Sequence, residues 1–389
     1  MEKFYSIKRY NTGSAKWHVP NIKNENDDYI SFTVADSDYQ VACPISEAIS
    51  DVLKHGILGY TYVDNQYLDT VVNWVKRHYS YEIESSWIIT SPGVVNSLFY
   101  SIKVFANNHN RVLVQTPVYN PFFSVVTNNK KELVENKLVY NKGKYTIDFE
   151  EIEKEFNKGI DCFIFCNPHN PVGRVWTKEE VYKIVNLCKK HQVILLSDEI
   201  HCDIIMKDYK FTSAMEFASF YDKMIVCTAP SKTFNIAGLQ TSNIFVKNSE
   251  LRLLLKKEFN NNFIHGPNIM GIAALKAAYT NCDEWLEEQN NHIHNNYVYL
   301  LEFFNKFIPN AIVTPLEGTY LVWVNLSYLK IKSTQLVNEL LDFKIAVNPG
   351  ETYRENNLCC IRINIATSLK TLKIGLEYLK NYINYKEVK

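Results

Sequence analysis

The sequence lacks several features that would assign it quickly to a class of protein. Its 389 residues contain 42 Lys and Arg against 42 Asp and Glu, so the formal net charge is zero. Without an excess of one sign, the chain is not expected to bind nucleic acid or an anionic membrane surface. It has no uncharged apolar run of about 18 residues, and M-E-K-F-Y at the N-terminus contains no apolar signal core, so neither membrane insertion nor export is expected.

The nine cysteines include no C-x-x-C pair. Several of them, such as Cys162, Cys166 and Cys227, lie within apolar runs. This placement is typical of reduced thiols in the core of a cytoplasmic protein, so we predict no metal site. The chain is 46% hydrophobic and 13% aromatic, which is enough for a large core. Because the balanced charge indicates no polyanionic partner, its ligand is expected to be small.

Short apolar, β-branched runs alternate with segments of helical period. This order predicts βαβ units and an α/β fold with a mostly parallel central sheet flanked by helices. The predicted strands are 87–90, 111–115, 161–166, 193–197, 223–228 and 242–246. A helix over 178–190 is expected to begin with a capping box of Thr177 and Glu180, and a second, longer helix is expected over 283–308.

Polar clusters follow five of these strands. They are S-P-G-V-V-N (91–96), T-P-V-Y-N-P (116–121), N-P-H-N-P-V-G-R (167–174), S-D-E-I-H (197–201) and T-A-P-S-K-T-F-N-I-A-G (228–238). Open α/β sheets bind ligands at the carboxyl ends of their strands. The five clusters are therefore predicted to meet at one edge of the sheet.

Each cluster also has an ordinary structural interpretation. S-P-G and N-P are common turn sequences, Asp198 could cap a turn, and Tyr119 could simply pack in the core. Lys232 is harder to explain in this way, because a buried ammonium is costly unless it is paired or neutral.

The joint order of N-P-H-N-P-V-G-R, S-D-E-I-H, S-K-T-F-N-I-A-G and R-I-N (362–364) resembles one family over nearly the whole chain. The family that it resembles is the pyridoxal-phosphate enzymes of fold type I, which include the class I/II aminotransferases. The N-terminal R-Y-N-T-G-S-A-K-W (9–17) and V-A-D-S-D-Y (34–39) are similar to its MalY/PatB branch of cystathionine β-lyases. The resemblance implies a large cofactor domain over 44–281, a smaller α/β domain formed by 1–43 with 282–389, and a homodimer with shared active sites.

The resemblance also implies the roles of the residues around the cofactor ring. Lys232 would bind the cofactor aldehyde through a neutral amine, and burial should lower its pKa toward the useful range. Asp198 would lie at the pyridine nitrogen and keep it protonated. Tyr119 would stack on the ring, and Asn170 would donate to its phenolic oxygen; both would also face the substrate.

The cofactor phosphate would lie at a helix N-terminus, where unpaired N–H groups and the helix dipole favour an anion. The backbone groups are those of Gly93, Val94 and Val95. Where the wider fold often has a hydroxyl, three residues before the lysine, this chain has Ala229, so Ser231 becomes the predicted side-chain donor. Tyr60 resembles the tyrosine that reaches the phosphate of the neighbouring subunit.

Arg362 matches the family's C-terminal arginine, whose guanidinium binds the substrate α-carboxylate. The preceding segment, 351–360, lacks the glycines common there, which leaves its loop shape open. His201 is included among the cofactor-binding residues, although His201 and His169 could each be ordinary hydrogen-bonding neighbours.

The predicted function is a carbon–sulfur β-lyase that converts cystathionine and related S-substituted L-cysteines to a thiol, pyruvate and ammonia. An aminotransferase remains an alternative, because it shares the chemistry up to loss of the α-proton. A regulatory interaction protein that retains a pyridoxal-phosphate site is an alternative of another class.

Overall fold

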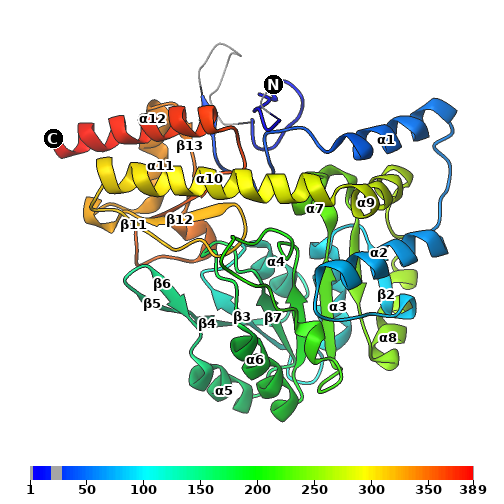
Figure 1. Ribbon diagram of the computed structural model, residues 1–389. Coiled ribbons are helices and arrows are strands. Elements are labelled where there is room, and N and C mark those ends of the chain that lie inside the picture. The colour runs from blue at the N-terminus through cyan, green and yellow to red at the C-terminus, as the bar shows by residue number, and fades with distance from the viewer. Residues whose placement is uncertain (1–2, 19–28, 389) are drawn as a thin grey trace.

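The computed structural model describes residues 3–18 and 29–388 (Figure 1). A seven-stranded sheet with the order β2-β10-β9-β8-β7-β3-β4 forms the centre of the larger part. Its strands are β2 (Ile88–Ser91), β3 (Arg111–Thr116), β4 (Glu132–Lys137), β7 (Cys162–Cys166), β8 (Ile194–Asp198), β9 (Met224–Thr228) and β10 (Ser242–Phe245). Only β10 runs antiparallel to its neighbours, so the predicted mostly parallel sheet is confirmed.

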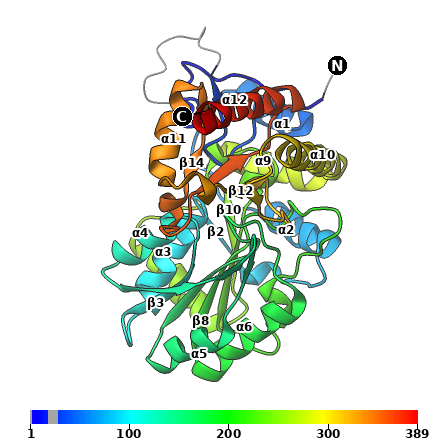
Figure 2. The same ribbon diagram turned by 90° about the vertical axis from the view of Figure 1, so that its left-hand side faces the viewer.

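Helices cover both faces of this sheet, as Figure 2 shows for α3 (Val94–Phe105) and α4 (Pro121–Thr127) on one side and α5 (Phe149–Asn157) and α6 (Lys178–His191) on the other. The sequence of β7 explains the two layers, because successive side chains of a strand point to opposite faces. Phe163 and Phe165 belong to the same core as α6, whereas Ile164 packs in the core that contains α3.

The two helices predicted in detail are present. Helix α6 begins with the predicted capping box: Thr177 Oγ1 accepts from Glu180 N at 3.2 Å, and Thr177 N donates to Glu180 Oε2 at 2.8 Å. Helix α10 spans Asp283–Phe307 and runs across the molecule in Figure 1, below α12 and above β11 and β12 of the second sheet.

A second, four-stranded sheet has the order β11-β12-β15-β14. Its strands are β11 (Ile312–Val313), β12 (Leu321–Asn325), β14 (Asn348–Pro349) and β15 (Cys360–Asn364). The positions of the two sheets support the division into 44–281 and 1–43 with 282–389, and we keep that division as a proposal.

The structure also contains further helices and two short strand pairs. The helices are α1 (Cys43–His55), α2 (Asn65–His78), α7 (Pro230–Thr233), α8 (Ser249–Asn261), α9 (Ile269–Asn281), α11 (Ser333–Asp342) and α12 (Leu369–Val388). Two short strand pairs are β1 (Ile30–Ser31) with β13 (Ile345–Ala346) and β5 (Val139–Asn141) with β6 (Lys144–Thr146). Among the helices of the described residues, none combines the length and apolar composition that crossing a membrane requires.

Candidate active site

The polar clusters predicted at the strand ends do meet at one edge of the sheet, around a cavity of about 340 Å³. Chain segments after β2, β3, β7, β8 and β9 contribute to its wall, and β15 of the second sheet closes it. The predicted site residues that line it are Gly93, Val94, Val95, Tyr119, Asn170, Asp198, His201, Ser231, Lys232 and Arg362. Residues far apart in the sequence are thus gathered at a single small-molecule site.

Lys232 lies in α7, the single helical turn that follows β9. Its half-buried side chain reaches the cavity, and Nζ donates to the carbonyl oxygen of Ala35 at 2.7 Å. Burial lowers the pKa of Lys232 to about 8; the nearby carboxylates of Asp36 and Asp198 oppose this change, while Arg362 adds to it. A substantial fraction of the amine is therefore neutral, and nucleophilic, near physiological pH.

Asp198 is the last residue of β8 and is buried. Its Oδ1 accepts a hydrogen bond from the backbone N–H of Ile200 at 3.1 Å, and it forms no salt bridge with any described residue. Burial raises the pKa of Asp198 to about 6, against the effects of that hydrogen bond and of Lys232. A cationic ring nitrogen beside this carboxylate would stabilise its ionised form.

Arg362 is a buried residue of β15. Its guanidinium donates to the Asn170 Oδ1 at 3.1 Å, the Thr33 carbonyl at 2.6 Å and the Asn348 Oδ1 at 3.3 Å, all of them uncharged acceptors. It has no carboxylate partner among residues 3–18 and 29–388, and its Nε has no hydrogen-bond partner. A buried guanidinium without a counter-ion on the wall of a cavity has the charge and the planar donors that suit a carboxylate.

The N-terminus of α3 forms the opposite end of the site. Gly93 caps this helix with φ 96°, a conformation that favours glycine, and no side chain caps the helix. A Cβ atom placed on Gly93 would meet no atom within 4 Å, so this part of the backbone faces open space. The Gly93 N–H itself donates to the Ser91 carbonyl at 2.9 Å, so the backbone donors that suit a phosphate here are those of Val94 and Val95.

Of three further residues considered in the sequence analysis, Tyr119 and His201 line the cavity and His169 does not. Burial raises the pKa of the Tyr119 hydroxyl, which keeps this cavity-lining side chain neutral. Burial lowers the pKa of His201 well below its usual value, with Lys232 and Arg362 adding to the effect, so the imidazole is neutral. His169 does not line the cavity; its Nε2 pairs with the Pro117 carbonyl at 2.9 Å, which supports the structural interpretation.

Tyr60 is the one predicted cofactor residue that does not line the cavity of its own chain. It lies in the stretch 56–62 between α1 and α2 and is fully exposed. Conversely, several lining residues were given no role in the sequence prediction, namely Val34, Ala35, Gln240, Thr241, Asn348 and Tyr353. The sequence offered a signal for three of these positions, because V-A-D-S-D-Y contains Val34 and Ala35 and the run K-T-F-N-I-A-G-L-Q contains Gln240.

These residues fit pyridoxal phosphate on the chemistry of their groups. The cavity combines a partly neutral lysine amine, a buried carboxylate and an uncapped helix N-terminus, which match the aldehyde, the pyridine nitrogen and the phosphate. The charge of Arg362 has no counter-ion among the described residues, because its hydrogen-bond partners are all neutral.

Comparison with known proteins also indicates a protein of the pyridoxal-phosphate type. The model of the aminotransferase class I and II family matches residues 27–379. The chain belongs to that family. It is 34% identical to cystathionine β-lyase PatB of Bacillus subtilis over 375 residues, which cover 96% of this chain and 97% of PatB.

A second curated relative, MalY of Escherichia coli, is 26% identical and is matched over 97% of each chain. Among solved structures, cystalysin from Treponema denticola, which contains pyridoxal 5'-phosphate, superposes with a TM-score of 0.94. It is 33% identical, over 100% of this chain and 99% of that one. The predicted MalY/PatB-type family and the fold type are therefore confirmed.

The pKa of about 8 for Lys232 leads to a testable pH dependence. In the cofactor-free protein, labelling of Lys232 by an amine-directed acylating reagent should increase through pH 8, because only the neutral amine reacts. Peptide mass spectrometry over a pH series measures the extent of Lys232 acylation, with exposed Lys373 of α12 as an internal reference. A midpoint at the ordinary lysine value of 10.5 would contradict the desolvated site.

Proposed function

We propose that this protein is a pyridoxal-phosphate-dependent carbon–sulfur β-lyase. Its substrates are cystathionine and related S-substituted L-cysteines, and its products are a thiol, pyruvate and ammonia. The observation that carries the proposal is that Lys232, with its lowered pKa, and Arg362, without a counter-ion, face one cavity. The likeness to PatB and to cystalysin, each above 30% identity over nearly the whole chain, supports the lyase activity.

Pyridoxal phosphate supplies an electron sink for the substrate α-carbon. Lys232 would hold the cofactor covalently and Asp198 would pair with its ring nitrogen. The N–H groups of Val94 and Val95, with the hydroxyl of Ser231, would bind its phosphate. Gly93 would line the same place without donating, because its N–H is bonded to the Ser91 carbonyl. Tyr119 and Asn170 would contact the ring and the substrate, and the neutral His201 completes the wall.

The chain's own groups then account for substrate orientation and proton movement. Arg362 binds the substrate α-carboxylate, and Asn170, which already accepts from Arg362 Nη1, holds that guanidinium in place. The Lys232 amine removes the α-proton as general base, which its pKa of about 8 permits. The C–S bond breaks with its electron pair on sulfur, so a thiolate leaves; the remaining three-carbon fragment is hydrolysed to pyruvate and ammonia.

The assay for this function is pyruvate release from cystathionine without any added keto acid. We expect steady formation of pyruvate and homocysteine by the protein, and none by Lys232→Ala, because that variant has neither the cofactor anchor nor the base. Lys370→Ala, at an exposed position of α12, is the matched control and should behave like the unmodified protein.

Two outcomes would overturn this function in different ways. Amino-group transfer that requires a keto acid, with no pyruvate from cystathionine, would favour an aminotransferase. A protein that binds the cofactor but is inert in both assays would favour the regulatory alternative.

Arg362 provides a second test. In Arg362→Lys the ammonium cannot present two parallel donors to a carboxylate, so kcat/KM should fall roughly 10- to 100-fold, mainly through KM. Steady-state kinetics with S-alkyl cysteines measures the loss. Arg354→Lys is the control, because Arg354 pairs with Glu135 and does not line the cavity; an equal loss there would contradict the assignment.

We further propose a homodimer in which Tyr60 reaches the cofactor phosphate of the partner subunit. Its full exposure, next to exposed Ile57, Leu58 and Tyr62, supports this proposal. Analytical ultracentrifugation should give twice the chain mass of 45.3 kDa. Tyr60→Phe should weaken cofactor affinity; a monomer with full activity would contradict the proposal.

A cytoplasmic location is proposed as well. All nine cysteines are free, and only Cys43 among them is exposed. Thiols persist in this state in a reducing compartment, which supports the proposal.

A further inference from the structure

A buried polar cluster lies directly behind the lysine of the candidate site. Thr233, the residue after Lys232, is completely buried, and its Oγ1 donates to Asp203 Oδ2 at 2.6 Å. The other carboxylate oxygen of Asp203, Oδ1, accepts from the hydroxyl of Tyr79, just beyond α2. None of these three residues lines the cofactor cavity, and the proposed chemistry does not use them.

Helix α10 ties the same two residues together from the other side. Gln289 Nε2 donates to the Thr233 carbonyl at 2.9 Å, and Asn290 Nδ2 donates to the Asp203 carbonyl at 2.8 Å. Thr233 is thus fixed through both its side chain and its backbone. Because Thr233 adjoins Lys232 in the single turn of α7, these bonds also restrict the path of the lysine backbone.

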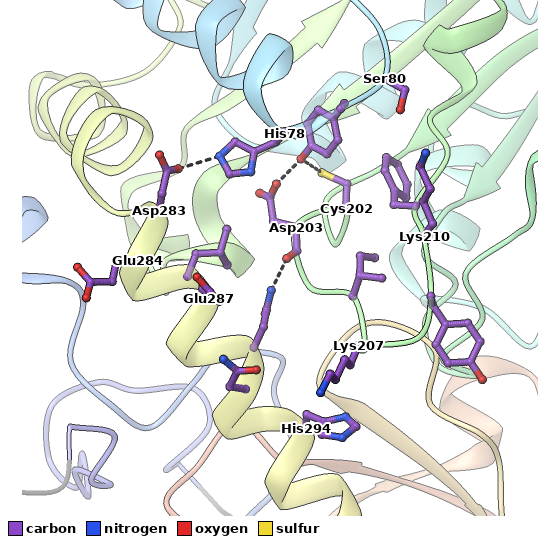
Figure 3. A pocket seen from close by; sticks show the side chains of 17 residues that line it. His78, Ser80, Cys202, Asp203, Lys207, Lys210, Asp283, Glu284, Glu287 and His294 are labelled. Carbon is purple, nitrogen blue, oxygen red and sulfur yellow. Dashed lines mark hydrogen bonds and ion pairs between the residues drawn. The ribbon is translucent and has the colours of Figure 1, made fainter.

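The cluster borders a second cavity, of about 680 Å³, which shares no lining residue with the first. Figure 3 shows Asp203 beside Cys202, with the acidic residues Asp283, Glu284 and Glu287 on α10 along the same cavity. The Asp203 carboxylate is buried and forms no salt bridge with any described residue. Burial raises the pKa of Asp203, and the bonds from Thr233 and Tyr79 oppose that change.

A buried carboxylate without a salt-bridge partner is an expensive way to hold a turn, and neutral partners would do so at a lower free-energy cost. Each of its two oxygens accepts from a different hydroxyl, one of Thr233 and one of Tyr79, so the carboxylate holds two chain segments in a fixed relation. The carboxylate therefore serves positional accuracy more than overall stability.

We propose that Asp203 is a positioning residue for Lys232, acting through the hydroxyl of Thr233. The carboxylate fixes the turn that presents the ε-amine to the cofactor and to the substrate α-proton. The inference rests on the proposed function, because it gives Lys232 its role as anchor and base.

The test compares Thr233→Val, which removes the hydroxyl at nearly constant shape, with Thr233→Ser, which keeps it. In the cofactor-loaded protein, Thr233→Val should lower kcat for pyruvate release roughly tenfold or more, because a misplaced base costs rate. KM should change less than about twofold, since Arg362 is untouched. The visible circular dichroism of the bound cofactor should change with kcat, and Thr233→Ser should retain most of both.

Thr314→Val is the matched control, because Thr314 is buried but its hydroxyl has no hydrogen-bond partner. It should leave kcat and the dichroism unchanged. If Thr233→Val does not fold, Asp203→Asn takes its place, because one acceptor oxygen becomes a donor and cannot serve both hydroxyls; the same losses are expected.

Unchanged kcat and dichroism in Thr233→Val, or equal losses in Thr233→Ser, would overturn the proposal, as would a change confined to KM. Should the unmodified protein release no pyruvate, the proposed function fails. The dichroism and the cofactor affinity of the variants still decide the positioning role in that case.

Discussion

The site depends on a half-buried amine whose charged form is disfavoured by desolvation. Lys232 lies in a turn after a fully buried strand, where desolvation disfavours the ammonium form. Two carboxylates, Asp36 and Asp198, act in the opposite direction but do not cancel the effect. The balance leaves the pKa of the amine close to neutral pH, where it can act as both nucleophile and base.

Burial also shifts the pKa of Asp198, but upward, whereas it shifts the pKa of Lys232 downward. It raises the pKa of Asp198 to about 6, so the carboxylate and the amine are driven toward their neutral forms together. A protonated pyridine nitrogen would stabilise the ionised form of Asp198, just as a substrate carboxylate would supply the counter-ion that Arg362 lacks. The polar groups of the cavity therefore match the cofactor and an amino acid better than they match one another.

The sequence predicted the elements that carry local signals. Strands β7 and β9 are continuous apolar runs, the capping box of α6 spans four residues, and both appear as expected. Strand β4 was not predicted because its sequence, E-L-V-E-N-K, contains only two apolar residues and they are adjacent, so it has neither an apolar run nor an alternating pattern; β11 and β14 are only two residues long. Such short strands have no periodicity to read.

The site residues that lie in local motifs were predictable from the sequence, whereas the contacts between distant segments were not. Motif residues such as Lys232 and Asn170 follow strands, so parallel topology places them together. The acceptor for the lysine amine, the Ala35 carbonyl, comes from a residue 197 positions away, and no local pattern indicates that contact. The link from Thr233 to Asp203 and α10 is likewise visible only in the folded chain.

Identification of the lysine that binds the cofactor tests the account most directly. The protein would be loaded with pyridoxal phosphate, reduced with borohydride, digested and mapped by mass spectrometry. The account predicts a single phosphopyridoxyl adduct, on Lys232. An adduct on another lysine, or none in a folded protein saturated with the cofactor, would contradict it.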